Sequence, residues 1–127
     1  LPDHHPVQSL EYYEQALKFF PEDMPVLVFS DAIEWCKSQE IFSPDRFMFS
    51  EPEEKHEDGA LVPYIDLCLM SMCSHHIIAN SSFSWWGAWL SNSKKVVSPS
   101  KWFEKDGPYH IIEDIIPQND NYKIIKI

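Results

Sequence analysis

Apolar residues form two kinds of pattern along the chain. One has the spacing of a helix, and the other is a short continuous run that is typical of a buried strand. Residues 9–20 carry apolar side chains at helical spacing, whereas residues 26–29 form a continuous apolar run that is typical of a strand in a parallel sheet. Both patterns recur further along the sequence. They predict helices over residues 9–20, 31–38, 63–73 and 82–91, and strands over 26–29, 46–50, 76–79, 95–98 and 122–127.

Strands and helices that alternate in this way predict an α/β domain. Each strand–helix–strand connection favours a right-handed crossover, which builds a Rossmann-like parallel sheet with helices on both faces. The 127 residues suit one domain or a piece of one. Ser9 and Asp31 are expected to cap the first and second helices. The helix over 63–73 is apolar on most sides, so we expect it to be buried.

Polar side chains follow two of the predicted strands, at the edge where parallel sheets bind ligands. Ser30 and Asp31 follow the first strand, and Asn80, Ser81 and Ser82 precede the fourth helix. The first N–H groups of a helix and its positive dipole end favour an anion such as phosphate. The same serines are also ordinary N-cap residues, a role worth about 1 kcal/mol. The pattern alone leaves both interpretations open.

Charge and composition narrow the function classes. The formal net charge is −10, which argues against a nucleic-acid partner because such a partner needs a basic face. Local dipoles can still hold a phosphorylated small molecule. Much of the acid lies in residues 51–58, which we interpret as a solvated loop. No run of about 18 apolar residues is present, so no membrane-spanning helix is expected.

Two further groups of residues could bind a metal or a sugar, but we expect a structural role for both. The cysteines and histidines at positions 68, 73, 75 and 76 lack the paired ligand spacing of zinc sites, so we expect no metal there. The three cysteines are expected to be reduced thiols in the core. Tryptophans of the last helix could stack on a sugar, but helix–sheet interfaces favour large apolar side chains, so core packing is expected. These tryptophans are Trp85, Trp86 and Trp89.

Three segments together resemble glycosyltransferase family 11, the α-1,2-fucosyltransferases, and most closely the bacterial members. They are residues 28–36, 66–71 and 75–90, with Trp102 beyond them. The string NSSFSWWGAWL at residues 80–90 is long and unusual, so its specificity is high. Two features depart from the family. Ala32 stands where its Ser-Asp-Asp turn has the second acid, and its His-x-Arg-Arg-Gly-Asp motif is absent and would lie upstream of residue 1.

The resemblance implies the nucleotide-binding half of a GT-B-like fold. On this basis residues 1–127 are a single, partial C-terminal Rossmann-like domain that binds GDP-fucose, with the acceptor domain and the arginine motif lying upstream. The implied reaction is inverting transfer of fucose from GDP-fucose to the 2-hydroxyl of a terminal galactose in a glycan, without a metal or another cofactor. The fragment alone is expected to be inactive, and the protein to be cytoplasmic or peripherally membrane-associated.

The resemblance also implies donor-binding roles. It places a donor phosphate on the Ser82 hydroxyl and on the N–H groups of Ser82 and Phe83, at the turn that contains Ser81. It favours Asp66 as the acceptor of two hydrogen bonds, from N1–H and N2–H₂ of guanine. The alternative for Asp66 is an acid that the dipole stabilises near a helix start.

The roles of the remaining candidates stay open. Ser30 and Asp31 either touch the ribose or base or begin their helix, and Asn80 either orients its turn or touches the donor. No residue is assigned as the catalytic base. The alternative functions are another fucosyltransferase on the same scaffold and a non-enzymatic flavodoxin-like or receiver-like module. A receiver needs an acidic pair, which the turn at residues 30–32 lacks.

Overall fold

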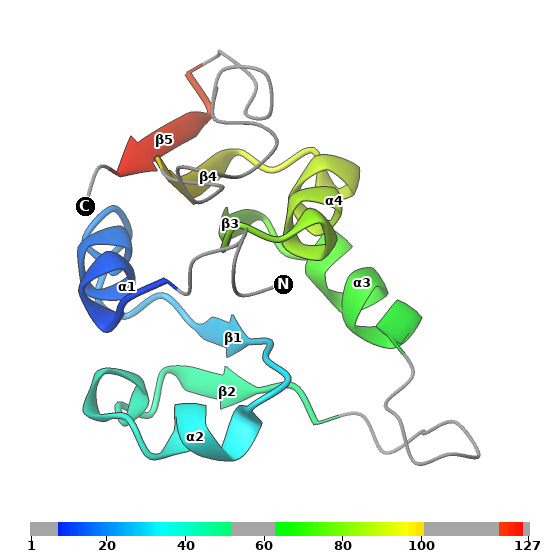
Figure 1. Ribbon diagram of the computed structural model, residues 1–127. Helices are drawn as coiled ribbons and strands as arrows, with labels where there is room; N and C mark the ends of the chain where they lie inside the picture. Colours follow the sequence, from blue (N-terminus) through cyan, green and yellow to red (C-terminus); the bar gives the residue numbers. More distant parts are fainter. Residues whose placement is uncertain (1–7, 52–62, 101–119, 126–127) are drawn as a thin grey trace, which may run out of the picture.

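The computed structural model describes residues 8–51, 63–100 and 120–125, in which helices and strands alternate as expected (Figure 1). The helices are α1 (Leu10–Leu17), α2 (Ile33–Lys37), the short 3₁₀-helix η1 (Glu40–Phe42), α3 (Pro63–Ser71) and α4 (Ser82–Ser91). The strands are β1 (Val26–Val28), β2 (Phe47–Phe49), β3 (His75–Ile77), β4 (Lys95–Pro99) and β5 (Tyr122–Ile125). The α/β class is therefore confirmed.

All strand pairs are parallel, but the strands form two sheets where one was expected. β1 pairs with β2, with Val28 opposite Phe49, and the second sheet has the order β3-β4-β5. The hydrophobic pattern identifies each strand, but it carries no information on which strand is its neighbour. The expectation of one continuous parallel sheet is corrected to two small parallel sheets within the described residues.

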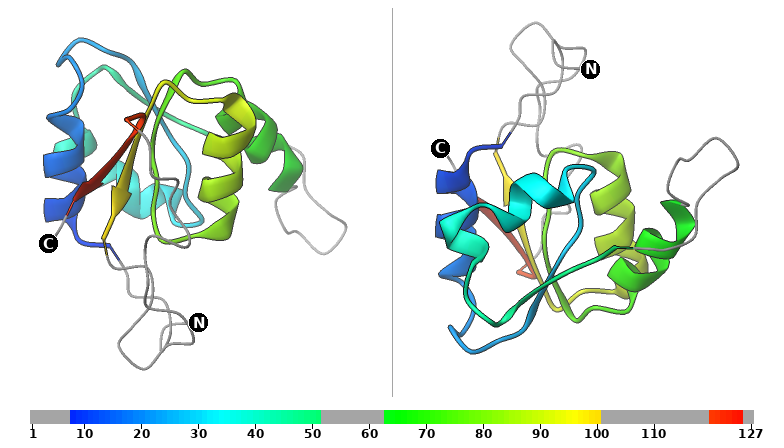
Figure 2. Two further views of the ribbon diagram at one scale, coloured as in Figure 1. Left: turned by 90° about the horizontal axis from the view of Figure 1, so that it is seen from above. Right: turned by 90° about the horizontal axis from the view of Figure 1, so that it is seen from below.

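The three-stranded sheet has helices on both faces, as predicted. Successive side chains of a strand point to opposite faces, so the fully buried Val96 and Val97 of β4 enter two different clusters. Val96 packs with Ile78 and Ala88 on the α4 side. Val97 packs with α1 on the other side, and Figure 2 shows α1 and α4 on opposite sides of β4 and β5.

Tyr12 ties α1 to the carboxyl end of this sheet. Ser9 caps α1 as predicted, with its side chain accepting from the Tyr12 N–H at 3.2 Å. The Tyr12 side chain is 1% exposed, and its hydroxyl lies 2.6 Å from the Ile78 carbonyl and 3.1 Å from that of Val97. Burial raises the pKa of the Tyr12 phenol well above its ordinary value. The hydroxyl therefore remains protonated, and the carbonyl that follows β3 and the Val97 carbonyl of β4 share its one proton.

Helix α3 is not buried on all sides, which corrects our expectation. Tyr64 and Leu69 of this helix are 62% and 36% exposed. Helix α3 packs instead against α4, where a Cβ added at Gly87 would lie 2.8 Å from the Cβ of Met70. One side of α3 thus meets a single neighbouring helix, and the apolar side chains on its other side remain exposed.

The tryptophans of α4 divide between core and surface. Trp85 packs against the Ile78–Val96 cluster, as predicted. Trp86 and Trp89 are 49% and 52% exposed, so the prediction of core packing is wrong for both. The rings of Trp85 and Trp89 stack, with centroids 5.5 Å apart and planes 8° apart. The exposed ring of Trp89 is therefore held by contact with Trp85.

Candidate functional site

The junction of β3 and α4 has the geometry of a capped helix start. Ser81 is the N-cap residue, with an extended backbone and a side chain that accepts from the Ser84 N–H at 3.4 Å. The first bond within the helix runs from the Trp85 N–H to the Ser81 carbonyl at 3.0 Å. Among the described residues, the N–H groups of Ser82 and Phe83 have no acceptor, and Ser82 is exposed. These two N–H groups are therefore available to an external anion.

The loop before α4 is held from two directions. The Ser84 hydroxyl lies 3.0 Å from the Ser81 carbonyl and 3.3 Å from that of Ala79. Asn80 is 8% exposed, and its Oδ1 accepts from Gln8 Nε2 at 3.0 Å. Of the two roles left open for Asn80, this contact supports orienting the turn.

The turn after β1 differs from the prediction. Helix α2 begins at Ile33, and its N-cap residue is Ala32, whose side chain makes no cap bond. Asp31 was expected to cap this helix, and that prediction is wrong. The Ser30 hydroxyl instead accepts from the Ala32 N–H at 2.9 Å, which closes a tight turn and delays the helix start. The Asp31 side chain is left exposed beside the carboxyl end of β1.

Asp66 lies beside the carboxyl end of β2, the strand that pairs with β1. It stands in the first turn of α3, is half-buried, and accepts from the Ser50 hydroxyl through Oδ1 at 2.7 Å. Ser50 directly follows β2 and is itself 8% exposed. The Ser50 N–H donates to the Val28 carbonyl of β1 at 2.9 Å, so both strands fix the position of this serine.

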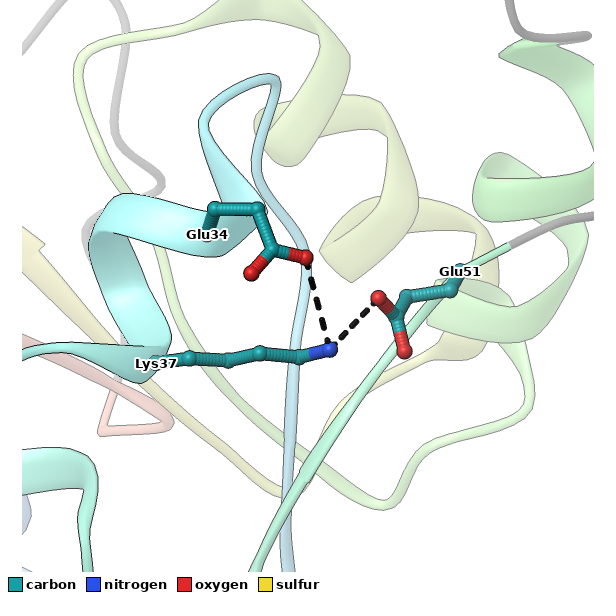
Figure 3. Close-up of polar contacts among 3 residues, drawn as sticks. All are labelled: Glu34, Lys37 and Glu51. Atoms are coloured by element: carbon teal, nitrogen blue, oxygen red, sulfur yellow. Dashed lines mark hydrogen bonds and ion pairs between the residues drawn. The ribbon is translucent and has the colours of Figure 1, made fainter.

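An ion pair joins the same strand end to α2. Lys37 Nζ lies 2.6 Å from Glu51 Oε1 and 3.6 Å from Glu34 Oε1, as Figure 3 shows. The hydrogen bond from Lys37 to Glu51 raises the pKa of Lys37. Glu51 is exposed, as expected for the acidic segment, but its carboxylate is paired. The rest of that segment, residues 52–58, lies outside the described residues.

The comparison with known proteins decides the family of this chain. A family model described as "Glycosyl transferase family 11" matches residues 3–122. The chain belongs to glycosyltransferase family 11. The matched range contains every candidate residue described above, including Asp66 after β2 and the serines at the start of α4.

Curated relatives of this family 11 chain include bacterial and mammalian glycosyltransferases. The chain is 40% identical over 110 residues to the "Alpha-1,2-colitosyltransferase" of Escherichia coli, covering 80% of this chain and 35% of the relative. It is 38% identical over 104 residues to the "O-antigen biosynthesis glycosyltransferase WbnK" of Escherichia coli, covering 78% of this chain and 32% of the relative.

A mammalian relative is more distant. The "Galactoside alpha-(1,2)-fucosyltransferase 2" of Oryctolagus cuniculus is 28% identical over 104 residues, covering 80% of this chain and 28% of the relative. The chain thus spans about a third of the length of the curated relatives that it matches. No solved structure matches the chain.

The family 11 candidates fall into two groups. Ser81, Ser82 and Phe83 meet at the start of α4, whereas Asp66 lies at the end of β2. Sequence reasoning missed Ser50, the partner of Asp66. The predicted strand over 46–50 included Ser50, whereas β2 ends at Phe49, so Ser50 follows its strand at the carboxyl edge of the sheet, where Ser30 also lies. A correct strand end would have made Ser50 a candidate in the same way as Ser30.

Residues 8–51, 63–100 and 120–125 contain no group of three or more His, Cys, Asp or Glu placed to hold a metal ion. The three cysteines are free, but only Cys36 is buried, while Cys68 is exposed and Cys73 is intermediate. The expectation of core thiols is therefore right for Cys36 and wrong for Cys68. No helix in the described ranges is long and apolar enough to cross a membrane.

Proposed function

We propose that the protein transfers fucose from GDP-fucose to the 2-hydroxyl of a terminal galactose in a glycan. In this proposal the chain supplies the donor-binding part of a GT-B-like transferase, and the acceptor binds to a domain outside it. The observation that carries the proposal is that Asp66 and the start of α4 both lie at carboxyl ends of parallel strands in a family 11 chain. Nucleotides bind at this edge in parallel α/β sheets.

Asp66 is the proposed reader of the guanine base. A carboxylate has about four acceptor sites, and Asp66 uses one of them for the Ser50 hydroxyl. The remaining sites can accept both N1–H and N2–H₂ from one guanine edge. Adenine offers no such donor pair, so this contact selects guanine.

The start of α4 is the proposed seat of the donor diphosphate. The N–H groups of Ser82 and Phe83 point away from the helix, and the Ser82 hydroxyl is exposed beside them. A diphosphate leaves with more negative charge than it carries in the bound donor, so these donors stabilise the transition state more than the ground state. An arginine outside this chain would complete the phosphate contacts.

Colitose is the second candidate for the transferred sugar. One observation favours it: the chain is 40% identical to a relative named for colitosyl transfer and 28% identical to the fucosyltransferases. Colitose is a deoxy analogue of fucose, so a site for one sugar differs from a site for the other at one hydroxyl. Rates of transfer from GDP-fucose and GDP-colitose to one galactoside distinguish the two candidates.

Calorimetric titration of the complete protein with GDP, ADP and UDP tests the reading of the base. We expect GDP to bind at least about tenfold more tightly than ADP, because guanine donates to the Asp66 carboxylate and hydrogen bonds to charged groups contribute about 1.5–3 kcal/mol. Asp66→Asn should remove this preference, since an amide cannot accept from two donors as a carboxylate does. Equal binding of the three nucleotides would contradict the proposal.

A second substitution tests the phosphate seat. Ser82→Ala should weaken GDP-fucose binding about threefold to tenfold by removing one hydrogen bond, and it should leave the KM for the acceptor unchanged. Ser91→Ala is the matched control, because this serine ends the same helix and its hydroxyl donates to the Ala88 carbonyl at 2.7 Å. A donor constant that is equal in the two variants would exclude Ser82 from the site.

The proposal includes no metal and no other cofactor. Neutralisation of the leaving diphosphate is assigned to helix N–H groups and arginine, which perform the role that a cation has in other transferases. Activity should therefore persist in excess chelator. A cytoplasmic or peripherally membrane-associated location is part of the same proposal, and fractionation of cells that express the complete protein tests it.

A further inference from the structure

We propose that Ser50 is a positioning residue that sets the base specificity of the site by orienting the carboxylate of Asp66. The inference rests on the proposed function, because it assigns Asp66 to the guanine base. It concerns a residue that lies in a different element from Asp66 and sixteen positions before it in the sequence.

A backbone hydrogen bond fixes the position of Ser50 independently of its side chain. Its N–H donates to Val28 at 2.9 Å, which continues the β1–β2 ladder one step beyond Phe49. The residue is 8% exposed, so surrounding atoms restrict its side chain. A hydroxyl held in this way is a rigid donor that can determine the orientation of a partner.

The bond to Asp66 has the ordinary geometry of a hydroxyl hydrogen bond. Its oxygen–oxygen distance of 2.7 Å is at the most common value for a hydroxyl donor, so the contact is well formed. An aspartate without such a partner rotates about two side-chain bonds and occupies several rotamers. The Ser50 bond selects one of them and engages Oδ1, which leaves Oδ2 and one further acceptor site for a ligand.

Recognition of the guanine edge depends on that orientation. Its two donors are parallel and in one plane, so a carboxylate accepts from both only when its own plane is aligned with the base. Without Ser50, alignment requires ordering the Asp66 side chain at the moment of binding, which reduces affinity. Nucleotides that lack this pair of donors do not incur that loss.

The experiment is a double-mutant cycle in the complete protein, with GDP and ADP as the titrated nucleotides. Ser50→Ala should weaken GDP binding about fivefold to tenfold and leave ADP binding unchanged. In the Asp66→Asn background, Ser50→Ala should have no further effect on GDP, because Ser50 acts through the carboxylate. Ser50→Thr keeps a hydroxyl at the same position and should restore most of the preference for GDP.

Ser71→Ala is the matched control. Its hydroxyl donates to the Cys68 carbonyl at 2.7 Å, the same length as the Ser50 bond, at the other end of α3. Loss of this bond should leave the GDP-to-ADP ratio as it is in the wild type. If Ser50→Ala fails to fold, Ser50→Cys, which has nearly the same shape and a weaker donor, should show a partial loss of the ratio.

The outcomes separate this inference from the function on which it rests. A wild-type protein that binds GDP and ADP equally overturns the guanine assignment and the role of Ser50 with it. A wild-type preference for GDP that survives in Ser50→Ala, or equal losses for GDP and ADP, overturns the role of Ser50 alone. Additive effects of Ser50→Ala and Asp66→Asn would do the same.

Discussion

The two sheets of this family 11 chain are stabilised in different ways. In the β3–β4–β5 sheet, Val96 and Val97 are fully buried, and helices cover both faces. In the β1–β2 sheet, every residue of β1 is partly exposed, and Met48 of β2 is 51% exposed. Polar contacts through Ser50 and Glu51 hold the end of the β1–β2 sheet.

This difference separates the two halves of the proposed donor site. The proposed phosphate site, at the start of α4, follows β3 of the well-packed sheet. Asp66, the proposed guanine-binding residue, contacts the end of β2 in the lightly packed sheet. Regions with few buried apolar contacts open at low free-energy cost. Substitutions in the β3–β4–β5 sheet should therefore reduce stability, and substitutions at the end of β2 should reduce nucleotide selectivity.

The largest effect on stability is expected from Tyr12→Phe. This change removes one buried hydroxyl and leaves the Ile78 carbonyl without that donor, while the Val97 carbonyl still accepts from the Ile78 N–H at 2.9 Å. The cost is about 1–3 kcal/mol, the penalty for an unpaired buried polar group. Urea unfolding of the complete protein measures it, and amide hydrogen exchange in β3 and β4 should show where the loss occurs.

Tyr64→Phe is the control for this substitution, since Tyr64 is 62% exposed and removal of its hydroxyl leaves no buried carbonyl without a donor. It should leave the unfolding free energy unchanged. The GDP-to-ADP ratio of Tyr12→Phe should equal that of the wild type. A change in that ratio would show that the two sheets are not separable in function.

A smaller loss is expected from Gly87→Ala at the contact of α3 and α4. Alanine gains about 1 kcal/mol of helix propensity over glycine, but its Cβ would lie 2.8 Å from the Cβ of Met70. Overpacking of this kind costs about 1–3 kcal/mol, so we expect a net loss of about 1 kcal/mol in the unfolding free energy. Urea unfolding measures this loss as well.

Met70→Ala tests which atoms of Met70 cause the clash. It removes the Met70 Sδ, which would lie 2.9 Å from the new methyl group, but it keeps the Cβ at 2.8 Å. The effect of Gly87→Ala should therefore be only partly relieved in the Met70→Ala background. Complete relief would mean that the flexible sulfur, and not the backbone separation of the helices, makes glycine necessary.

The elements of the fold were predictable because local patterns determine them. The helix over 82–91 was predicted with the bounds that the structure shows, and Ser9 and Ser81 cap their helices as cap residues do. Pairing was not predictable in this way. Strands of three residues carry too little pattern to specify a neighbour, so the separation into two sheets became visible only in the structure.

The candidate site was predictable only in part, for the same reason. Ser81 and Ser82 are adjacent to Phe83 in sequence, and their arrangement follows from one helix start. The contact of Asp66 with Ser50 joins two elements and depends on how α3 lies against β2. The error at Asp31 has another cause: the hydroxyl of the preceding Ser30 accepts from the Ala32 N–H, and the helix begins only after this turn.

The pH dependence of stability offers a test of the well-packed sheet. Burial lowers the pKa of His76, although its hydrogen bond to the Met70 carbonyl at 2.6 Å partly opposes this effect. The unfolded chain therefore binds a proton near pH 6.5 and the folded chain only at lower pH. Stability should be lost as the pH falls below about 6.5, by less than about 1.4 kcal/mol per pH unit for this one group.

His76→Gln isolates that contribution from those of the acidic residues. Glutamine keeps a donor for the Met70 carbonyl and does not titrate. The difference in unfolding free energy between wild type and variant should decrease between about pH 7.5 and 5.5, because only the wild type loses this contribution. A constant difference over that range would show that His76 does not bind its proton preferentially in the unfolded state.

The smallest effect is expected from Lys37→Gln in α2, which removes the ion pair with Glu51 near the end of β2. The Glu34 and Glu51 side chains are 86% and 51% exposed, so water and salt screen their attraction to Lys37. We expect a small loss of stability at low ionic strength that disappears at physiological salt, and an unchanged GDP-to-ADP ratio at both. The same titrations used for Ser50→Ala measure that ratio.

This last substitution decides which polar contact matters at the end of β2. Glu51 and Ser50 are adjacent, but of the two only Ser50 is buried and only Ser50 touches Asp66. If Lys37→Gln reduced the ratio as much as Ser50→Ala does, the position of the whole strand end would control the base reader. If the ratio is unchanged, selectivity depends on a single buried hydroxyl, and the light packing of β1 and β2 is compatible with a specific site.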